Sequence, residues 1–253
     1  MRIVRFRYKK EFRIGALEQD RIRMLDHRFH GTGESIPAGR LRLLAPVNPG
    51  KIVCVGLNYI DHAREMDMPL PREPLLFLKP SSALIGPGEA IIRPCVSGRV
   101  DHEAELGVVI RRAAYRVTVR DARRYILGYT CVNDVTARDI QKKDGQWTRS
   151  KSFDTFCPVG PWIETSITDP NRLSITAAVN DEVRQRSNTA NFVFGVEELV
   201  SFISRVMTLY PGDLIATGTP SGIGPLNPGD RVTVTIGSVG ALTNTVEDES
   251  YSD

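Results

Sequence analysis

The chain has 253 residues, of which 41% are hydrophobic and 25% are charged, so it can bury a full core in one domain or two. Its formal net charge is only +3, and its basic residues are scattered, with short pairs at 111–112 and 123–124 that are typical of solvated surfaces. No basic stripe with interleaved aromatic residues is present, which argues against nucleic acid as a partner.

The N-terminal residues alternate like a β-strand and lack the apolar segment of a signal peptide. No apolar run is long enough to span a bilayer, so no membrane association is expected. The cysteines form no C-x-x-C pair, which favours free thiols in a reducing compartment; they are Cys54, Cys95, Cys131 and Cys157. These features together predict a cytoplasmic protein.

Residues 1–47 are predicted to form a small N-terminal β unit, because apolar residues fall in two strand-like runs around a turn at 9–11. A linker rich in Pro and Gly, residues 45–50, leads into a main domain predicted for 48–253. Short strands alternate there with turns, at 51–57, 75–78, 90–92, 174–179, 214–216 and 232–236. Residues 196–207 have helical spacing. The pattern predicts a β-rich α+β fold with few helices and no phosphate-binding glycine motif.

His62 and Glu65 lie in a segment, residues 58–66, that follows the first main-domain strand. If this segment is a short helix, the two side chains share one face. A carboxylate beside an imidazole raises its basicity and can help it activate water. Spacing alone favours the other possibility, an incidental pair on a solvated helix.

Glu103 and Glu105 lie in residues 100–110, which are predicted to form one largely buried strand. Side chains two apart on a strand point to one face, so the two carboxylates would repel each other near the core. A divalent cation with hard oxygen ligands would resolve that conflict. An edge strand with both acids in water is the alternative.

Asp134 ends a second strand-like segment, residues 125–134. It could cap a helix predicted for 135–140. It could also join the two glutamates, since three carboxylates can hold Mg²⁺ or Mn²⁺ and leave positions for substrate.

Three further residues have less specific surroundings. Lys79 and Lys151 each stand among apolar or small residues, where a lysine near a metal could neutralise an enolate or carboxylate. For either lysine alone, an aliphatic stem on the surface with its ammonium group in solvent is the simpler interpretation. Thr219 follows the strand at 214–216 in a loop rich in Gly and hydroxyl groups, which could bind an anion or form a tight turn.

Taken in order, these segments resemble the fumarylacetoacetate hydrolase family from about residue 51 to residue 246. The chain looks closest to short members that act on acylpyruvates and oxaloacetate. The resemblance rests on residues 55–59 with His62, 77–80, 101–105, 133–139, 147–154, 158–161, 211–213 and 217–222. Asp181 departs from the family pattern, in which glycine often follows the asparagine, and the N-terminal unit is too variable to carry the resemblance.

The resemblance implies a roll of packed mixed β-sheets, a homodimer, and a site for Mg²⁺ or Mn²⁺. In that site Glu103, Glu105 and Asp134 match the metal ligands, and Lys151 matches the lysine beside the metal. His62 and Glu65 match a dyad on a lid, here residues 58–68, that orders over substrate. The matching substrate-binding positions are Arg138 at the rim, Gln141 where the family has a lid glutamine, Thr219 at the substrate carboxylate, and Lys79.

The function predicted from this resemblance is metal-dependent hydrolysis of a C–C bond in a small-molecule 2,4-dioxo acid. His62 would activate water, and the metal with Lys151 would stabilise a pyruvate enolate. Oxaloacetate decarboxylation and isomerisation or hydration of 2-hydroxy-dienoates in aromatic catabolism remain alternatives, because they use the same chelated acid. A non-catalytic binding protein on the same fold is a further alternative, although every residue of the proposed site is present.

Overall fold

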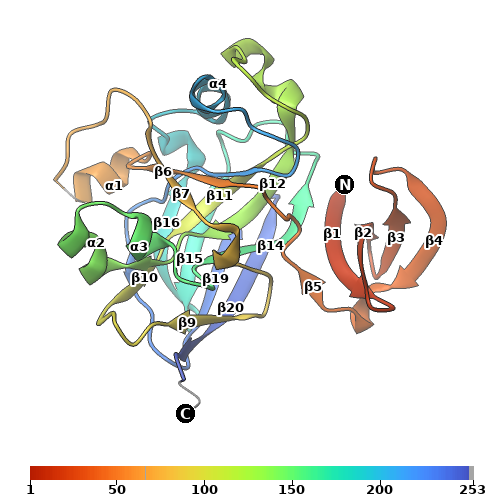
Figure 1. Cartoon of the computed structure of the whole chain (residues 1–253), viewed down its shortest axis with the longest axis horizontal. Helices are drawn as coiled ribbons and strands as arrows, with labels where there is room; N and C mark the ends of the chain where they lie inside the picture. Colours follow the sequence, from red (N-terminus) through yellow and green to blue (C-terminus); the bar gives the residue numbers. More distant parts are fainter. Residues whose placement is uncertain (66, 251–253) are drawn as a thin grey trace.

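The computed structural model describes residues 1–65 and 67–250, and it is built from three β-sheets with few helices (Figure 1). The largest sheet has the order β4-β3-β2-β1-β14-β12-β11-β17-β6-β7, with β5 added to β1 and β8 added to β14. Its strands are β1 (Arg2–Tyr8), β2 (Glu11–Glu18), β3 (Arg21–Leu25), β4 (Gly31–Pro37), β5 (Leu43–Leu44), β6 (Ile52–Gly56), β7 (Leu75–Lys79), β8 (Leu84–Ile85), β11 (Ala104–Ile110), β12 (Ile126–Asn133), β14 (Cys157–Glu164) and β17 (Leu214–Ala216).

Two smaller sheets complete the β-structure. The five-stranded sheet has the order β16-β15-β19-β20-β9, and the three-stranded sheet has the order β13-β10-β18. Their strands are β9 (Ala90–Arg93), β10 (Val100–His102), β13 (Thr136–Ala137), β15 (Ser174–Val179), β16 (Glu182–Asn188), β18 (Gly224–Pro225), β19 (Arg231–Ile236) and β20 (Gly240–Asp248).

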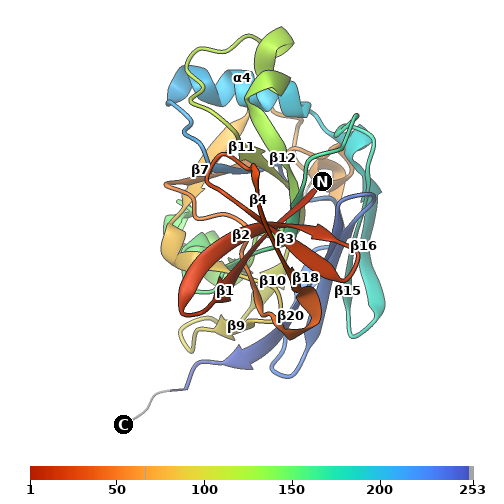
Figure 2. The same cartoon turned by 90° about the vertical axis from the view of Figure 1, so that its right-hand side faces the viewer.

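The helices are short. They are α1 (Ile60–Glu65), α2 (Arg138–Asp144), α3 (Thr148–Lys151) and α4 (Val196–Val206), with 3₁₀ turns at Ala38–Arg40, Ser81–Ala83, Val119–Tyr125 and Thr189–Asn191. The amphipathic helix predicted for 196–207 is α4, and it covers one end of the sheets (Figures 1 and 2). Within the described residues, no helix has the length and hydropathy needed to cross a membrane. The β-rich α+β fold predicted from the sequence is therefore confirmed.

The core lies mainly between the large sheet and the five-stranded sheet. Val53 and Val55 of β6 face this core together with Ile175 of β15 and Leu199 of α4. The alternate residues of β6, such as Ile52 and Cys54, pack into a second cluster on the other face. Because β6 is buried on both faces, its sequence is a continuous apolar run rather than an alternating one.

The N-terminal strands form a small β unit that projects from the main body (Figure 1). β1 pairs with β14 through Arg2–Glu164 and Ile3–Ile163, so this unit extends the large sheet. Its own core contains Val4, Phe6, Ile22 and Met24, with Trp162 packed against it. Phe12, an apolar residue of the predicted pattern, is 65% exposed.

One predicted strand differs from the structure. Residues 100–110 do not form one strand, because β10 ends at His102 in the small sheet and β11 begins at Ala104 in the large sheet. Glu103 lies at the break between them. The chain changes sheets here, so β10 pairs with β13 and β18, while β11 pairs with β12 and β17.

Candidate metal centre and catalytic pocket

Three carboxylates meet where β11 and β12 pair. Ala104 lies opposite Asn133, so Glu103 and Glu105 flank the end of β12, and Asp134 follows that end directly. The amide of Asp134 donates to the carbonyl of Glu103 at 2.9 Å, which holds the two segments side by side. One oxygen from each of the three carboxylates therefore lies within 4.8 Å of the others, and all three residues are buried.

Asp134 does not cap a helix. β13 follows it, and α2 begins only at Arg138, three residues later than predicted. Both carboxylate oxygens of Asp134 accept hydrogen bonds from lysine side chains instead. The strand pairing of Thr136 with Asp101 keeps this segment extended.

Two buried lysines contact the acidic cluster. Nζ of Lys151, at the end of α3, donates to Glu103 at 2.8 Å and to Asp134 at 2.6 Å. Nζ of Lys79, at the end of β7, donates to Asp134 at 2.6 Å and to the carbonyl of Val135 at 3.0 Å. The solvent-facing lysine favoured for each position alone is therefore wrong, because both side chains are almost fully buried.

Arg138 lies deeper than the rim position predicted for it and is 8% exposed. Its guanidinium group bonds to Asp101 at 3.1 Å and also pairs with Glu103. Its remaining contact, 2.6 Å long, is to the side-chain oxygen of Gln141, which leaves the amide nitrogen of Gln141 for the pocket. The two residues thus form a connected wall beside the carboxylates.

Glu105 is the least compensated member of the cluster. Its hydrogen bond comes from the backbone amide of Gly218 at 2.9 Å, and no lysine or arginine among the described residues forms an ion pair with it. Burial and repulsion from Asp134 and Glu103 raise the pKa of Glu105 well above its usual range. Burial also raises the pKa of Glu103, but the charges of Lys151 and Arg138 outweigh burial and leave that pKa well below its usual range.

This donor set fits a hard divalent cation. Carboxylate oxygens are the preferred ligands of Mg²⁺ and Mn²⁺, and ligand atoms about 2.0–2.2 Å from one ion lie roughly 3–4 Å apart. In this structure one oxygen from each carboxylate lies within 4.8 Å of the others, so the three can approach one ion. A cation would also compensate the charge that the protein leaves on Glu105. The acidic triad can therefore bind a divalent metal.

α1 brings the His62–Glu65 pair to the same pocket. Nδ1 of His62 lies 3.0 Å from one oxygen of Glu65, and the amide of Gly222 donates to the other oxygen at 2.9 Å. Because a carboxylate accepts, Nδ1 is the donor in this contact, and in the neutral tautomer that fits it the lone pair is on Nε2. His62 is 7% exposed, so the solvated incidental pair that spacing alone favours is wrong. Met66, within the predicted lid, lies outside the described residues.

The loop after β17 places Thr219 in the pocket wall. Gly218 precedes it with φ +97°, and a Cβ there would come within 2.8 Å of the Cβ of Asn58, so both conformation and space require glycine. Thr217 is held by a hydrogen bond to Leu106 of β11 at 2.9 Å. The loop is thus bonded to β11, which carries Glu105, and through Gly222 to Glu65 of α1.

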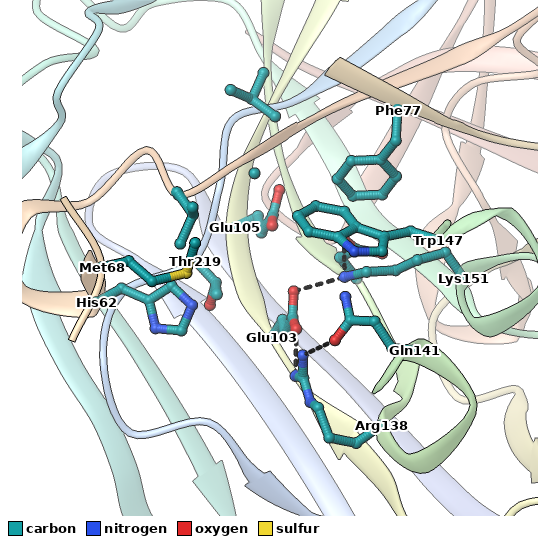
Figure 3. Close-up of a pocket in the computed structure, with 14 residues that line it drawn as sticks. His62, Met68, Phe77, Glu103, Glu105, Arg138, Gln141, Trp147, Lys151 and Thr219 are labelled. Carbon is teal, nitrogen blue, oxygen red and sulfur yellow. Dashed lines mark hydrogen bonds and ion pairs between the residues drawn. The ribbon is translucent and has the colours of Figure 1, made fainter. Parts of the chain in front are cut away.

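These groups surround one cavity of about 80 Å³ (Figure 3). His62, Met68 and Thr219 lie on one side of the two glutamates, and Lys151, Gln141, Trp147 and Phe77 lie on the other. Lys151 Nζ lies 5.0 Å from the ring centre of Phe77, whose ring is edge-on to Trp147. Eight of the sequence-predicted site residues therefore line the cavity, whereas Glu65 reaches it through His62 and Lys79 through Asp134.

Sequence reasoning missed several contributors. Asp101, which holds Arg138, precedes Glu103 by two residues, and this alternation of acids could have been noticed. Thr136 donates to Glu103 at 3.1 Å, and Trp147 supplies the aromatic wall; no local pattern marks either residue. Gln185 hydrogen-bonds Thr219 from a mostly exposed strand and was also missed.

Comparison with known proteins gives two family matches. Residues 51–247 match the family described as fumarylacetoacetate (FAA) hydrolase C-terminal, and residues 1–46 match the one described as Rv2993c-like, N-terminal. Among curated proteins, the chain is 45% identical to the mitochondrial oxaloacetate tautomerase FAHD2A of Bos taurus over 223 residues, covering 83% of this chain and 71% of the relative.

Two solved structures are similar over nearly the whole chain. The 2-hydroxyhepta-2,4-diene-1,7-dioate isomerase of Mycobacterium marinum is 42% identical with a TM-score of 0.92, and the match covers 99% of this chain and 100% of that one. The maleylpyruvate hydrolase of Sphingobium sp. SYK-6, in complex with manganese(II) and pyruvate, is 33% identical with a TM-score of 0.83 and the same coverage.

Proposed function

This chain belongs to the fumarylacetoacetate hydrolase family, and from that premise we propose that it is a divalent-metal-dependent isomerase of small 2-oxo acids. It would interconvert keto, enol and 2-hydroxy-dienoate forms by moving one proton. The observation that carries the proposal is one cavity lined by the carboxylate triad, Lys151 and His62, with Glu65 hydrogen-bonded to His62. Similarity to an oxaloacetate tautomerase and to a hydroxy-dienoate isomerase supports proton transfer over bond cleavage.

The proposed metal ligands are Glu103, Glu105 and Asp134, with Mg²⁺ or Mn²⁺ as the ion. When bound, such an ion supplies positive charge that holds the 2-oxo acid head and increases the acidity of the adjacent C–H. The cavity of about 80 Å³ suits a small acid, and larger substituents would extend along the apolar wall of Phe77 and Trp147.

Lys151 has the role of stabilising the enolate. Burial lowers its pKa, but the charges of Asp134 and Glu103 outweigh burial and raise the pKa above its usual range, so it stays protonated. A fixed ammonium group beside the developing enolate oxygen costs no reorganisation during the reaction. Gln141, held by Arg138, and Thr219 are the proposed hydrogen-bond donors to substrate oxygens.

His62 is the proposed proton carrier. Its Nε2 lone pair takes a proton from the substrate hydroxyl or carbon, and Glu65 stabilises the imidazolium that forms. The same proton is then returned to a different atom of the enolate, so the number of atoms in the substrate does not change. An isomerase needs no further catalytic group for this step, since no nucleophile attacks the substrate.

Hydrolysis of acylpyruvates is the second candidate, favoured by the His62–Glu65 geometry and by the similarity to a maleylpyruvate hydrolase. In that reaction His62 takes the proton from water, and the hydroxide adds to the distal carbonyl carbon. The C–C bond then breaks, with the electron pair leaving as a pyruvate enolate. Oxaloacetate decarboxylation would use the same enolate without water.

One substrate panel separates these reactions. A 2-hydroxy-dienoate, the enol of oxaloacetate and an acylpyruvate are each assayed with Mg²⁺ and with Mn²⁺. Loss of enol absorbance without pyruvate or CO₂ supports the isomerase, pyruvate with a free acid indicates the hydrolase, and CO₂ indicates the decarboxylase. No metal-dependent turnover of any of the three would contradict the proposal and favour a non-catalytic binding protein.

We also propose, from the family resemblance, that the protein acts as a homodimer. Light scattering during gel filtration would give the mass of the particle directly, and a monomer at assay concentration would contradict this.

A further inference from the structure

We propose that Gln185 is a positioning residue, which sets the Thr219 hydroxyl as a hydrogen-bond donor toward an oxygen of the bound carboxylate. This inference rests on the proposed function, because it assumes that Thr219 contacts the 2-oxo acid. Gln185 does not line the cavity itself and acts only through its neighbours.

The chain turns Gln185 inward at a β-bulge. In the β15–β16 pair, Ala177 lies opposite Gln185 and Ala178 opposite Val183, so Arg184 is the extra residue. A bulge re-aims the side chains next to it. Val183 is consequently 44% exposed, whereas Gln185 is fully buried on the same strand.

All hydrogen-bonding positions of the Gln185 amide are occupied. Its oxygen accepts from the amide of Ala104 at 2.9 Å and from Nδ1 of His102 at 3.1 Å. Its nitrogen donates to the carbonyl of Pro220 and to Oγ1 of Thr219, both at 2.8 Å. A backbone N–H can only donate and a carbonyl can only accept, so the orientation of this amide is fixed by its partners.

This orientation decides what the Thr219 hydroxyl can do. Oγ1 already accepts from Gln185, so the hydroxyl proton must point to another acceptor. Within the described part of the chain, no hydrogen bond from this hydroxyl to the protein is found, and Thr219 lines the cavity. The hydroxyl is therefore preset to donate to a ligand oxygen. Ala104 stands between Glu103 and Glu105, so the same amide ties Thr219 to the metal-ligand segment.

The test measures oxalate binding, with Mg²⁺, by calorimetry. Oxalate carries the carboxylate and second oxygen of a pyruvate enolate. Thr219→Val should weaken oxalate about 10-fold or more, as expected for a lost hydrogen bond to a charged group. Gln185→Glu should weaken it similarly, because its carboxylate can only accept and would draw the Thr219 proton away from the ligand.

The decisive variant combines the two substitutions. If Gln185 acts through Thr219, adding Gln185→Glu to Thr219→Val should change the affinity by less than about 2-fold. Additive losses would overturn the inference. Asn244→Asp is the matched control: Asn244 is another buried amide that donates to two carbonyls, those of Gly86 and Glu89, but it lies outside the pocket. Its oxalate affinity should match the wild type.

Neutron diffraction from the unaltered protein with Mg²⁺ and oxalate tests the same point without any variant. A Thr219 deuteron directed at oxalate supports the inference, and one directed at Gln185 overturns it. If Thr219→Val weakens oxalate but Gln185→Glu does not, the inference fails and the proposed function stands. If the unaltered protein does not bind oxalate with Mg²⁺, both fail.

Discussion

Glu105 gives the sharpest test of the metal site at the scale of single residues. Its carboxylate is buried with one backbone donor, so Glu105→Gln removes a costly charge and retains an oxygen for the Gly218 amide. The metal-free variant should melt at or above the wild-type temperature. Mn²⁺ or Mg²⁺ should raise the melting temperature of the wild type but not of the variant.

Glu103→Ala should behave differently, since it removes one of the two carboxylates that pair with the buried ammonium of Lys151 and with the guanidinium of Arg138. It should lose metal-dependent activity and also some metal-free stability. Glu247→Ala, on an exposed position of β20, is the control for both. Undiminished metal stabilisation in Glu105→Gln would contradict the assignment of the ligands.

His62 and Lys151 should have separable effects on catalysis. Loss of a general acid or base typically lowers a rate by about 10²–10⁴-fold, so His62→Gln should reduce isomerisation and acylpyruvate hydrolysis by that amount. Oxaloacetate decarboxylation should fall less, because CO₂ leaves without proton transfer from carbon or water. Lys151→Met should damage all three reactions, since each passes through an enolate.

Rates must be compared at saturating metal, so that weakened metal binding is not mistaken for lost proton transfer. If His62→Gln lowers all three reactions equally at unchanged metal affinity, His62 positions substrate and is not the proton carrier.

At the scale of elements, α1 is expected to act as a lid. Two side-chain hydrogen bonds join α1 to the rest of the described chain: Asp61 accepts from Ser187 at 2.6 Å, and Glu65 accepts from Gly222 at 2.9 Å. Segments with few anchors open at low free energy. Hydrogen exchange in residues 58–65 should therefore slow when oxalate and Mg²⁺ bind. Equal exchange with and without ligand, against unchanged α4 as reference, would show that α1 is not a lid.

The helices and strands show which parts of the fold could be predicted from the sequence. Apolar periodicity predicted α4 and most strands of the main domain, because burial repeats at a fixed spacing along each. It could not predict the break at Glu103, since residues on both sides of the break are buried and only the pairing partners change. The burial of Gln185 could not be predicted from the sequence either, because a bulge is defined by the register with the partner strand.

The candidate site was predictable for a different reason. Carboxylates, a lysine and a His–Glu pair are chemically distinctive, and their order along the chain resembles one family. The contacts that hold them were not: Lys79 and Arg138 were expected to bind substrate, and only the fold reveals their ion pairs with Asp134, Asp101 and Glu103. The apolar wall of Phe77 and Trp147 likewise exists only after folding.

At the scale of the whole molecule, Glu164 joins the N-terminal β unit to the main body. It ends β14 opposite Arg2, and accepts from the hydroxyl of Ser166 at 2.7 Å and from its amide at 3.0 Å. Burial raises the pKa of Glu164, but these hydrogen bonds and the Met1 amino group outweigh burial and lower the pKa. A lowered pKa stabilises the fold above the pKa of the unfolded chain and loses that effect as pH falls.

Glu164→Gln should therefore lower the free energy of unfolding by about 1–3 kcal/mol at pH 7. The difference from the wild type should shrink as the pH falls below about 4. Urea unfolding at several pH values measures it. A difference that stays constant from pH 7 to pH 3 would mean that the charge of Glu164 is not involved.

The parallel pairing of β17 with β6 also governs when the site can exist. Leu214 pairs with Ile52, which is far away in the sequence. The loop carrying Thr219 can therefore join the pocket only after most of the chain has been synthesised and these two distant strands have paired. Until then, the three carboxylates lack the Gly218 amide and the opposite wall. Mg²⁺ or Mn²⁺ should accordingly leave the refolding rate unchanged and slow unfolding, because the ion recognises an arrangement that forms last.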